Sequence, residues 1–283
     1  MKNKDIMSRK ISVVKRAFTQ PDPLPKKALF CDPSAGRPCV TLCGAGVEGC
    51  GLGCGEVRQA VIEGIARTGV EIAVGNMKVG CGGTCRRGPI MGFPQRMFFY
   101  VGVKSADVPR IIDETIMGGK LIFPFLSLDS ERSYRSDLFY DKHSGLLAAI
   151  DEKVCMVDVA RYFLDFEENL SCGKCVPCRI GLKRAHECVN RISAGEGTEE
   201  DLEQIKLLCQ VMETTPNCEF AAASIKPLQS AVNYFEDEFR KHIGEKECSA
   251  GVCEQLVAYQ RKLATPEIPG QTRILDLTPR EVG

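Results

Sequence analysis

Three cysteines spaced two residues apart form the clearest chemical motif in this chain. Cys172, Cys175 and Cys178 lie within the short stretch 171–179. Thiolates at this spacing can each take one iron on one face of a [4Fe–4S] cluster, and the fourth iron then needs a distant ligand. Cys218, which precedes an expected helix, is the best candidate for that ligand. Zinc sites favour paired C-x2-C units over a triple with one remote cysteine, so the motif predicts a [4Fe–4S] cluster.

A second group of cysteines lies in the N-terminal half of the chain. Cys81 and Cys85 form a C-x3-C pair in a Gly-rich loop. Two thiolate pairs from two loops can bind a [2Fe–2S] cluster. Redox-active dithiols of the thioredoxin type instead use C-x-x-C at a helix N-terminus, a spacing that this region lacks. The upstream partner pair must then come from Cys39, Cys43, Cys50 and Cys54.

A third group lies near the C-terminus and contains one of the chain's three histidines. His242, Cys248 and Cys253 follow the spacing H-x5-C-x4-C. One imidazole with several thiolates suits tetrahedral zinc better than an electron carrier. The alternative interpretation is a solvated histidine beside cysteines that only fill space.

Cysteine usage sets the broad class of the protein. The chain has 283 residues, 16 cysteines and no tryptophan. Such usage indicates either disulfides in a secreted protein or metal binding inside the cell. Disulfide scaffolds are usually short, whereas this chain is long and many of its cysteines lie in Gly-rich loops. We therefore expect metal binding.

Charge and hydropathy exclude several other classes. With 37 basic and 37 acidic side chains, the chain has no bulk charge that would attract nucleic acid or an anionic membrane. No apolar run is long enough to span a bilayer. Residues 1–27 are basic and polar and lack the apolar core of a secretion signal. We expect a cytoplasmic protein with no membrane span and no nucleic-acid partner.

The patterning predicts an α+β multidomain protein, in which an α/β region precedes an all-α region. Strands and helices of the first region are expected at 40–42, 56–68, 70–74, 90–93, 97–103 and 108–117. The predicted segments are an N-terminal arm at 1–36, the α/β domain at 37–120, an irregular linker at 121–150, a helical domain at 151–245 and a C-terminal tail at 246–283 that carries the last two cysteines.

The helical region has four amphipathic segments and a short fifth one. They are expected at 154–166, 177–193, 198–212, 221–243 and 253–263. Pro227 should kink or restart the fourth helix, and the acidic run 199–203 is expected to be a solvated helix start. Short connections favour an antiparallel four-helix bundle, which would return Cys218 to the end that holds the triple-cysteine motif.

Residues 151–253 resemble the C-terminal helical domain of the NADH-binding flavoprotein subunit of respiratory complex I. They are more similar still to the equivalent subunit of electron-bifurcating [FeFe] hydrogenases and related NAD-linked complexes. The resemblance rests on 154–163, the triple-cysteine motif, 197–202, Cys218 and 235–239. It implies a [4Fe–4S] cluster that receives electrons from FMN, with ligands Cys172, Cys175, Cys178 and Cys218.

The same resemblance implies a structural zinc just past the bundle, where Cys248 and Cys253 lie. Cys155 is then the expected fourth zinc ligand beside His242, because it lies in a resemblance motif and has no other role. Cys188 and Cys209 are expected to be small core residues, and Cys31 and Cys39 have no assigned role.

Residues 37–120 resemble the thioredoxin-like [2Fe–2S] ferredoxin family. The resemblance rests on three features of the sequence. The first is a strand followed by a cysteine-rich loop and a helix, the second is a strand followed by C-x3-C and then Gly-Pro, and the third is the pair of segments 98–103 and 108–109. It implies a thioredoxin-like fold whose cluster is held by Cys43, Cys81, Cys85 and one further cysteine. Cys50 fits that position, with Cys54 as its rival, since the spacing is atypical.

The chain departs from the flavoprotein family in one respect that bears on function. No FMN- and NADH-binding domain precedes the bundle, and no G-x-G-x-x-G loop stands between a strand and a helix. We therefore expect an electron-transfer subunit of a multisubunit, flavin-based NAD(P)-linked oxidoreductase, of which electron bifurcation is one form. Its partners would be flavin- and NAD(P)-binding subunits, and it would have no substrate site of its own. The alternative is a scaffold subunit stabilised by zinc in place of redox clusters.

Overall fold

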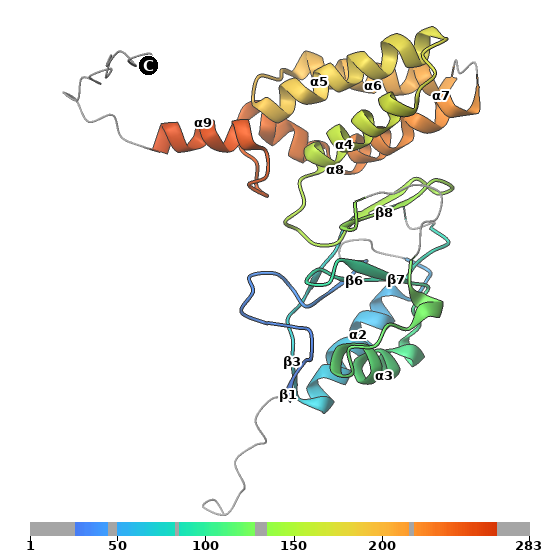
Figure 1. The fold of residues 1–283 in the computed structure, drawn as a ribbon, viewed down its shortest axis with the longest axis vertical. Coiled ribbons are helices and arrows are strands. Elements are labelled where there is room, and N and C mark those ends of the chain that lie inside the picture. The colour runs from blue at the N-terminus through green and yellow to red at the C-terminus, as the bar shows by residue number, and fades with distance from the viewer. Residues whose placement is uncertain (1–25, 45–49, 83–84, 128–134, 215–217, 265–283) are drawn as a thin grey trace, which may run out of the picture. The chain divides into compact units, whose positions relative to one another are not determined.

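The computed structural model describes residues 26–44, 50–82, 85–127, 135–214 and 218–264 (Figure 1). The chain divides into two compact units, Met1–Val154 (unit 1) and Cys155–Gly283 (unit 2). Unit 1 is mixed α/β and unit 2 is mostly helical, which confirms the predicted order of the two classes. Among the described residues, none of the helices has the length and apolar character that crossing a bilayer requires.

A four-stranded sheet forms the centre of unit 1. Its strand order is β4–β2–β6–β7, with β2 parallel to β4 and antiparallel to β6, and with β6 antiparallel to β7. The strands are β2 (Val40–Leu42), β4 (Val74–Asn76), β6 (Ile90–Phe93) and β7 (Phe98–Val101). The predicted first strand and the predicted hairpin are confirmed. The single strand expected at 70–74 is wrong, because two short strands, β3 (Val70–Glu71) and β4, replace it.

Helices cover this sheet and bury a common apolar core. They are α2 (Cys54–Thr68), η1 (Ser105–Asp107), α3 (Val108–Arg110) and the π-helical turn η2 (Ile111–Met117). Gly64 on α2 faces Ile112, and a Cβ there would lie 2.5 Å from Ile112 Cδ1, so the glycine permits the close approach of the two helices. A two-stranded parallel sheet joins β1 (Lys26–Lys27) to β3.

The stretch expected to be an irregular linker contains a β-hairpin. Strands β8 (Leu138–Asp141) and β9 (Leu146–Ala149) pair antiparallel, and β9 also pairs with β5 (Lys78–Gly80). The linker expectation is therefore wrong for these residues. All four residues of β9 are buried, so the strand lacks the alternating pattern by which a half-exposed strand is recognised. The short helical turn η3 (Phe123–Phe125) precedes the hairpin.

Unit 2 consists of helices joined by short connections. They are α4 (Met156–Leu170), η4 (Pro177–Leu182) running into α5 (Lys183–Ala194), α6 (Glu199–Thr214), α7 (Glu219–Ser224), α8 (Lys226–Gly244) and α9 (Glu254–Ala264). Helix α4 packs against α5 and α8, and α6 packs against the same two helices. The predicted helices are confirmed, and Pro227 restarts a helix because it occupies the first turn of α8.

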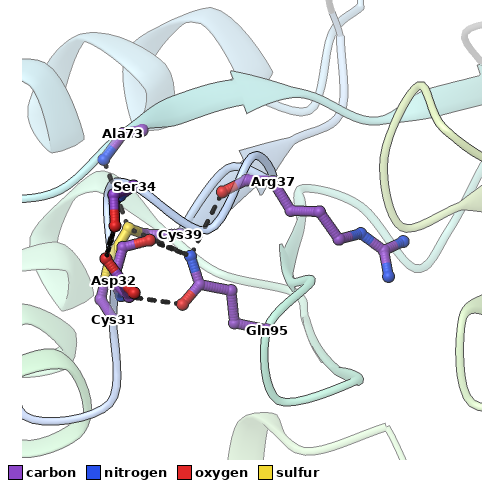
Figure 2. Close-up of a disulfide and its surroundings, with 7 residues drawn as sticks. All are labelled: Cys31, Asp32, Ser34, Arg37, Cys39, Ala73 and Gln95. Carbon is purple, nitrogen blue, oxygen red and sulfur yellow. Dashed lines mark hydrogen bonds between the residues drawn. A yellow bond between two sulfur atoms is a disulfide. The ribbon is translucent and has the colours of Figure 1, made fainter.

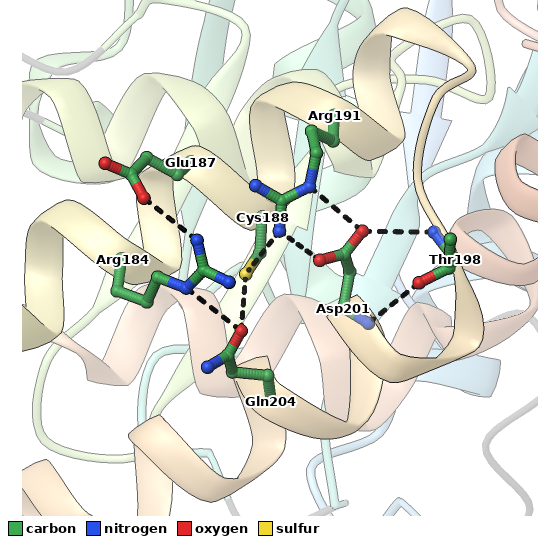
Figure 3. Close-up of polar contacts among 7 residues, drawn as sticks. All are labelled: Arg184, Glu187, Cys188, Arg191, Thr198, Asp201 and Gln204. Carbon is green, nitrogen blue, oxygen red and sulfur yellow. Dashed lines mark hydrogen bonds and ion pairs between the residues drawn. The ribbon is translucent and has the colours of Figure 1, made fainter.

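The corner between α5 and α6 is closed by an ion pair (Figure 3). Arg191 donates to both carboxylate oxygens of Asp201, with Nε to Oδ2 at 3.2 Å. The Thr198 N–H donates to Asp201 Oδ2 at 3.1 Å, so the carboxylate also caps the start of α6. A hydrogen bond from Arg191 lowers the pKa of Asp201, with burial acting in the opposite direction. The acidic run 199–203 was expected to be solvated. That expectation is wrong for Asp201, which is only 6% exposed.

A disulfide joins Cys31 to Cys39 in unit 1 (Figure 2). The loop that it closes is also held by Gln95, whose side-chain oxygen accepts from the Asp32 N–H at 2.8 Å. The Gln95 amide nitrogen donates to the carbonyls of Asp32 at 2.9 Å and Arg37 at 3.2 Å. These two cysteines are therefore not available to a metal.

Candidate metal centres

Five cysteines of unit 1 line one pocket. They lie at the end of β2, before and at the start of α2, and in the loop after β5: Cys43, Cys50, Cys54, Cys81 and Cys85. The predicted C-x3-C pair and every predicted upstream candidate except Cys39 meet there. Because a [2Fe–2S] cluster takes four protein ligands, the pocket holds one thiol more than the cluster needs.

The upstream thiols are in mutual contact. The Sγ of Cys54 lies 3.4 Å from the Sγ of Cys43 and 3.4 Å from the Sγ of Cys50. The Ile90 N–H donates to Cys43 Sγ at 3.0 Å. A hydrogen bond from Cys54 lowers the pKa of Cys43, and the Ile90 N–H adds to this against the effect of burial. Gly44 makes the contact sterically possible, since a Cβ there would lie 2.6 Å from Cys54 Cβ.

The downstream pair, Cys81 and Cys85, lines the same pocket together with apolar side chains. Cys85 is buried and Cys81 is half-buried. Burial raises the pKa of Cys85, whereas the backbone N–H of Gly88 favours its thiolate. Val79 of β5 and Leu146 of β9 complete the pocket lining. Sequence analysis missed this apolar cover because it assigned no strand to residues 138–149.

The pocket fits an iron–sulfur cluster by its donor set. All of its candidate ligands are thiols, and at least one of them already accepts a backbone N–H, which is the hydrogen bond that tunes cluster sulfur.

The triple-cysteine motif of unit 2 connects α4 to α5. Cys172 is exposed in the loop after α4, Cys175 is half-buried and Cys178 is buried in the first turn of η4. Cys218 is exposed and occupies the N-cap position of α7. Burial raises the pKa of Cys178, a hydrogen bond with Ser171 lowers it, and the nearby thiols of Cys175 and Cys218 raise it. The donor set is again all thiol and fits a [4Fe–4S] cluster.

Two features of sequence shape this loop. Gly173 adopts φ +64°, a left-handed conformation that favours glycine, and thereby turns the chain between the first two cysteines. Gly181 of η4 lies against Met212 of α6, where a Cβ would come 2.8 Å from Met212 Sδ. The cysteine-bearing turn can therefore approach α6 closely.

The third group forms a compact, fully buried cluster. One ligand atom from each of its members, Cys155, His242, Cys248 and Cys253, lies within 4.8 Å of the others. His242 Nε2 is 3.4 Å from Cys155 Sγ and 3.4 Å from Cys253 Sγ, and the two sulfurs are 3.8 Å apart. His242 Nδ1 lies 2.7 Å from the Glu238 carbonyl oxygen, which orients Nε2 toward the thiols.

Electrostatics within this cluster favour a bound cation. Hydrogen bonds from Cys155 and Cys253 lower the pKa of Cys248, while the pKa of Cys155 is raised because its thiol donates. Burial works against charge on His242, but hydrogen bonds to Cys155 and Cys248 raise its pKa to about 10. One divalent cation that replaced the ligand protons would satisfy all four groups.

Besides the disulfide pair, two further cysteines lie outside all three groups. Cys188 on α5 and Cys209 on α6 are buried, which confirms that they are core residues. Arg191 donates to Cys188 Sγ at 3.4 Å, as Figure 3 shows.

Comparison with known proteins bears on the helical unit. Residues 158–242 match the family described as the NADH-ubiquinone oxidoreductase-F iron-sulfur binding region. The NADP-reducing hydrogenase subunit HndC of Solidesulfovibrio fructosivorans is 41% identical over 116 residues, which are 41% of this chain and 24% of that protein. The F 2 subunit of NADH-quinone oxidoreductase from Rhizobium meliloti (strain 1021) is 38% identical over 105 residues, which are 37% of this chain and 25% of that protein.

A solved NAD+-reducing [NiFe]-hydrogenase, in the H2-reduced state, matches 42% of this chain and 21% of its own chain, at 24% identity and a TM-score of 0.33. The chain thus spans about a quarter of the length of the curated relatives that it matches. Residues 158–242 are an iron–sulfur binding region of the type found in these oxidoreductase subunits, as the resemblance predicted.

Proposed function

We propose that this chain is an iron–sulfur electron-transfer subunit of a multisubunit, flavin-based oxidoreductase that uses NAD(P). The observation that supports this best is the presence of a second all-thiol site in a chain that already has an iron–sulfur binding region. Two such sites suit a relay of electrons. An electron-bifurcating complex is one setting in which a relay of this kind would serve, with flavin- and NAD(P)-binding subunits as partners.

Two sets of thiolates would hold the clusters. Cys172, Cys175, Cys178 and Cys218 would bind a [4Fe–4S] cluster, and Cys43, Cys81 and Cys85, with either Cys50 or Cys54, would bind a [2Fe–2S] cluster. When bound, such clusters accept and release single electrons.

The surrounding residues would set the reduction potentials. Lys174 and Arg179 are exposed beside the triple-cysteine motif, and their positive charge favours the reduced, more negative state. The Ile90 N–H does the same at Cys43 through its hydrogen bond to sulfur.

The fold assignments that accompany this function are also proposals. We assign unit 1 to a thioredoxin-like fold on the parallel β2–β4 pair, the antiparallel β6–β7 hairpin and the helices α2 and α3. We assign α4, α5, α6 and α8 to a four-helix bundle on their mutual packing. A cytoplasmic location suits the clusters, whose ligand thiols must stay reduced, although a disulfide such as Cys31–Cys39 is rare in that compartment.

Cys155, His242, Cys248 and Cys253 would hold a structural zinc ion. Four protein ligands leave no open position, which is the arrangement of structural and not catalytic zinc. The site joins the start of α4 to the end of α8 and the start of α9.

Anaerobic purification with the native partner subunits tests the proposal. Iron, acid-labile sulfide and zinc are counted, and EPR spectra of the reduced protein are recorded at two temperatures. We expect two distinct signals. Cys178→Ser should remove or alter the signal seen only at the lower temperature and leave the other. Cys188→Ser, a matched change of a buried cysteine that belongs to no site, should leave both. Colourless protein with zinc but no sulfide would contradict the proposal and favour the zinc-stabilised scaffold.

A further inference from the structure

The fifth cysteine of the unit 1 pocket has no role in a cluster with four ligands. Sequence resemblance favours Cys50 as the partner of Cys43, with Cys54 as the rival. The structure gives grounds for ranking the two. This inference rests on the proposed function, since it presupposes that the pocket holds a [2Fe–2S] cluster.

Sulfur–sulfur distances are the first ground. Two thiolates on one tetrahedral metal, with bonds of about 2.3 Å, lie roughly 3.8 Å apart. The Cys43–Cys54 pair, at 3.4 Å, is already close to this spacing. The Sγ of Cys54 also lies 3.4 Å from the Sγ of Cys50, so the Cys50 thiol is adjacent to the position that the Cys54 sulfur would occupy on the iron.

Burial and backbone support are the second ground. Cys54 is 5% exposed and is the first residue of α2, so the helix fixes its position. Cys50 is only half-buried and precedes the helix. Gly51 and Gly53 lie between them: a Cβ on Gly51 would contact nothing within 4 Å, and Gly53 adopts φ +80°. These glycines allow Cys50 to shift relative to the fixed helix start.

We propose that Cys54 pairs with Cys43 on one iron, and that Cys50 is a reserve ligand that replaces Cys54. In the exchange, the iron–sulfur bond to Cys54 breaks as one to Cys50 forms. The proton released by the Cys50 thiol passes to the Cys54 thiolate, so charge and electron count stay constant. Cys43 remains fixed, since its sulfur is held by the Ile90 N–H.

Alanine variants of the full chain, prepared anaerobically, test the exchange, because alanine cannot bind iron as serine can. Cys50→Ala should keep two irons in the pocket and the wild-type [2Fe–2S] EPR and visible circular dichroism spectra. Cys54→Ala should keep the cluster but change both spectra, since Cys50 now binds. The double variant and the control Cys85→Ala should lose the cluster. Far-UV circular dichroism checks that each variant is folded.

The outcomes separate this inference from the proposed function. If the wild-type protein shows no [2Fe–2S] signal, the proposed function fails at this site. If the wild-type protein holds the cluster but Cys54→Ala loses it, Cys50 is no reserve and the inference is wrong. It is equally wrong if Cys54→Ala has the wild-type spectra, because Cys54 is then not a ligand.

Discussion

Removal of one imidazole tests the proposed zinc site most directly. In His242→Ala the cluster keeps three thiols but loses the ring that faces two of them at 3.4 Å. We expect unit 2 to lose its zinc and, with it, most of the stability that metal binding supplies. Iron and sulfide should stay at wild-type levels, because the triple-cysteine motif lies elsewhere in the unit.

The size of the effect follows from linkage. A ligand present at a thousand times its dissociation constant stabilises the folded state by about 4 kcal/mol. In a domain of this size, one kcal/mol shifts the melting temperature by roughly 4 °C, so zinc should raise it by roughly 16 °C. Loss of the buried ring should also lower the free energy of unfolding by about 1–3 kcal/mol whether or not zinc is bound, because His242 is only 2% exposed.

Thermal unfolding with and without added zinc separates the two contributions. Wild-type protein should respond to zinc and His242→Ala should not. His186→Ala is the matched control: this histidine lies on α5 of the same unit, and its Nδ1 is 2.7 Å from Glu168. It should cost no more than about 1 kcal/mol and keep the full zinc response. If His242→Ala still bound one zinc per chain with a wild-type response, the ligand assignment would be refuted. The zinc response should also weaken in acid, since the ligands must lose protons to bind.

Two further predictions concern contacts that stabilise each unit. Asp201→Asn should cost unit 2 about 1.5–3 kcal/mol near pH 7, measured by denaturant unfolding, because Arg191 then lacks its charged partner. Because the pKa of Asp201 is lowered in the folded state, this stabilisation is complete above pH 3.8 and is lost as the pH falls through the folded-state value, where wild type and variant should converge. In unit 1, Cys31→Ser/Cys39→Ser opens a loop with a sequence separation of 8 and should cost about 2.5 kcal/mol. A dithiol reductant should destabilise the wild type by about the same 2.5 kcal/mol and should leave the stability of the double variant unchanged. If the reductant destabilised both proteins to the same extent, the disulfide would be contradicted.

Local patterns predicted the helices well and the short strands less well. The buried positions of α2, which include Val57, Val61 and Gly64, recur at helical spacing, so the helix could be recognised from sequence. By contrast, β9 is buried throughout and spans only Leu146–Ala149, too few residues to show a period. Its partner β5 is distant in the chain, and no local signal specifies that pairing.

Site residues were predictable where spacing itself encodes the chemistry. The histidine–cysteine cluster was expected from H-x5-C-x4-C, and Cys155, which lies far from it in sequence, was expected only through resemblance. All four groups meet in the structure. The pairing of Cys31 with Cys39 has no comparable signal, because C-x7-C is not diagnostic of a disulfide. The sequence favours Cys50 over Cys54 through resemblance, whereas the sulfur–sulfur distances on which the opposite proposal rests have no signal in the spacing of these cysteines.

Exposure differs between the two thiol sites of unit 2. In the cluster of Cys155, His242, Cys248 and Cys253 every member is buried, which suits an ion that only holds helices together. In the triple-cysteine site, Cys172 and Cys218 are exposed. A site that exchanges electrons with a partner protein must be approachable, whereas a structural ion gains from complete exclusion of water. This difference in burial, together with the single imidazole, agrees with the two roles that we propose for the thiols of unit 2: an electron-transfer cluster and a structural zinc ion.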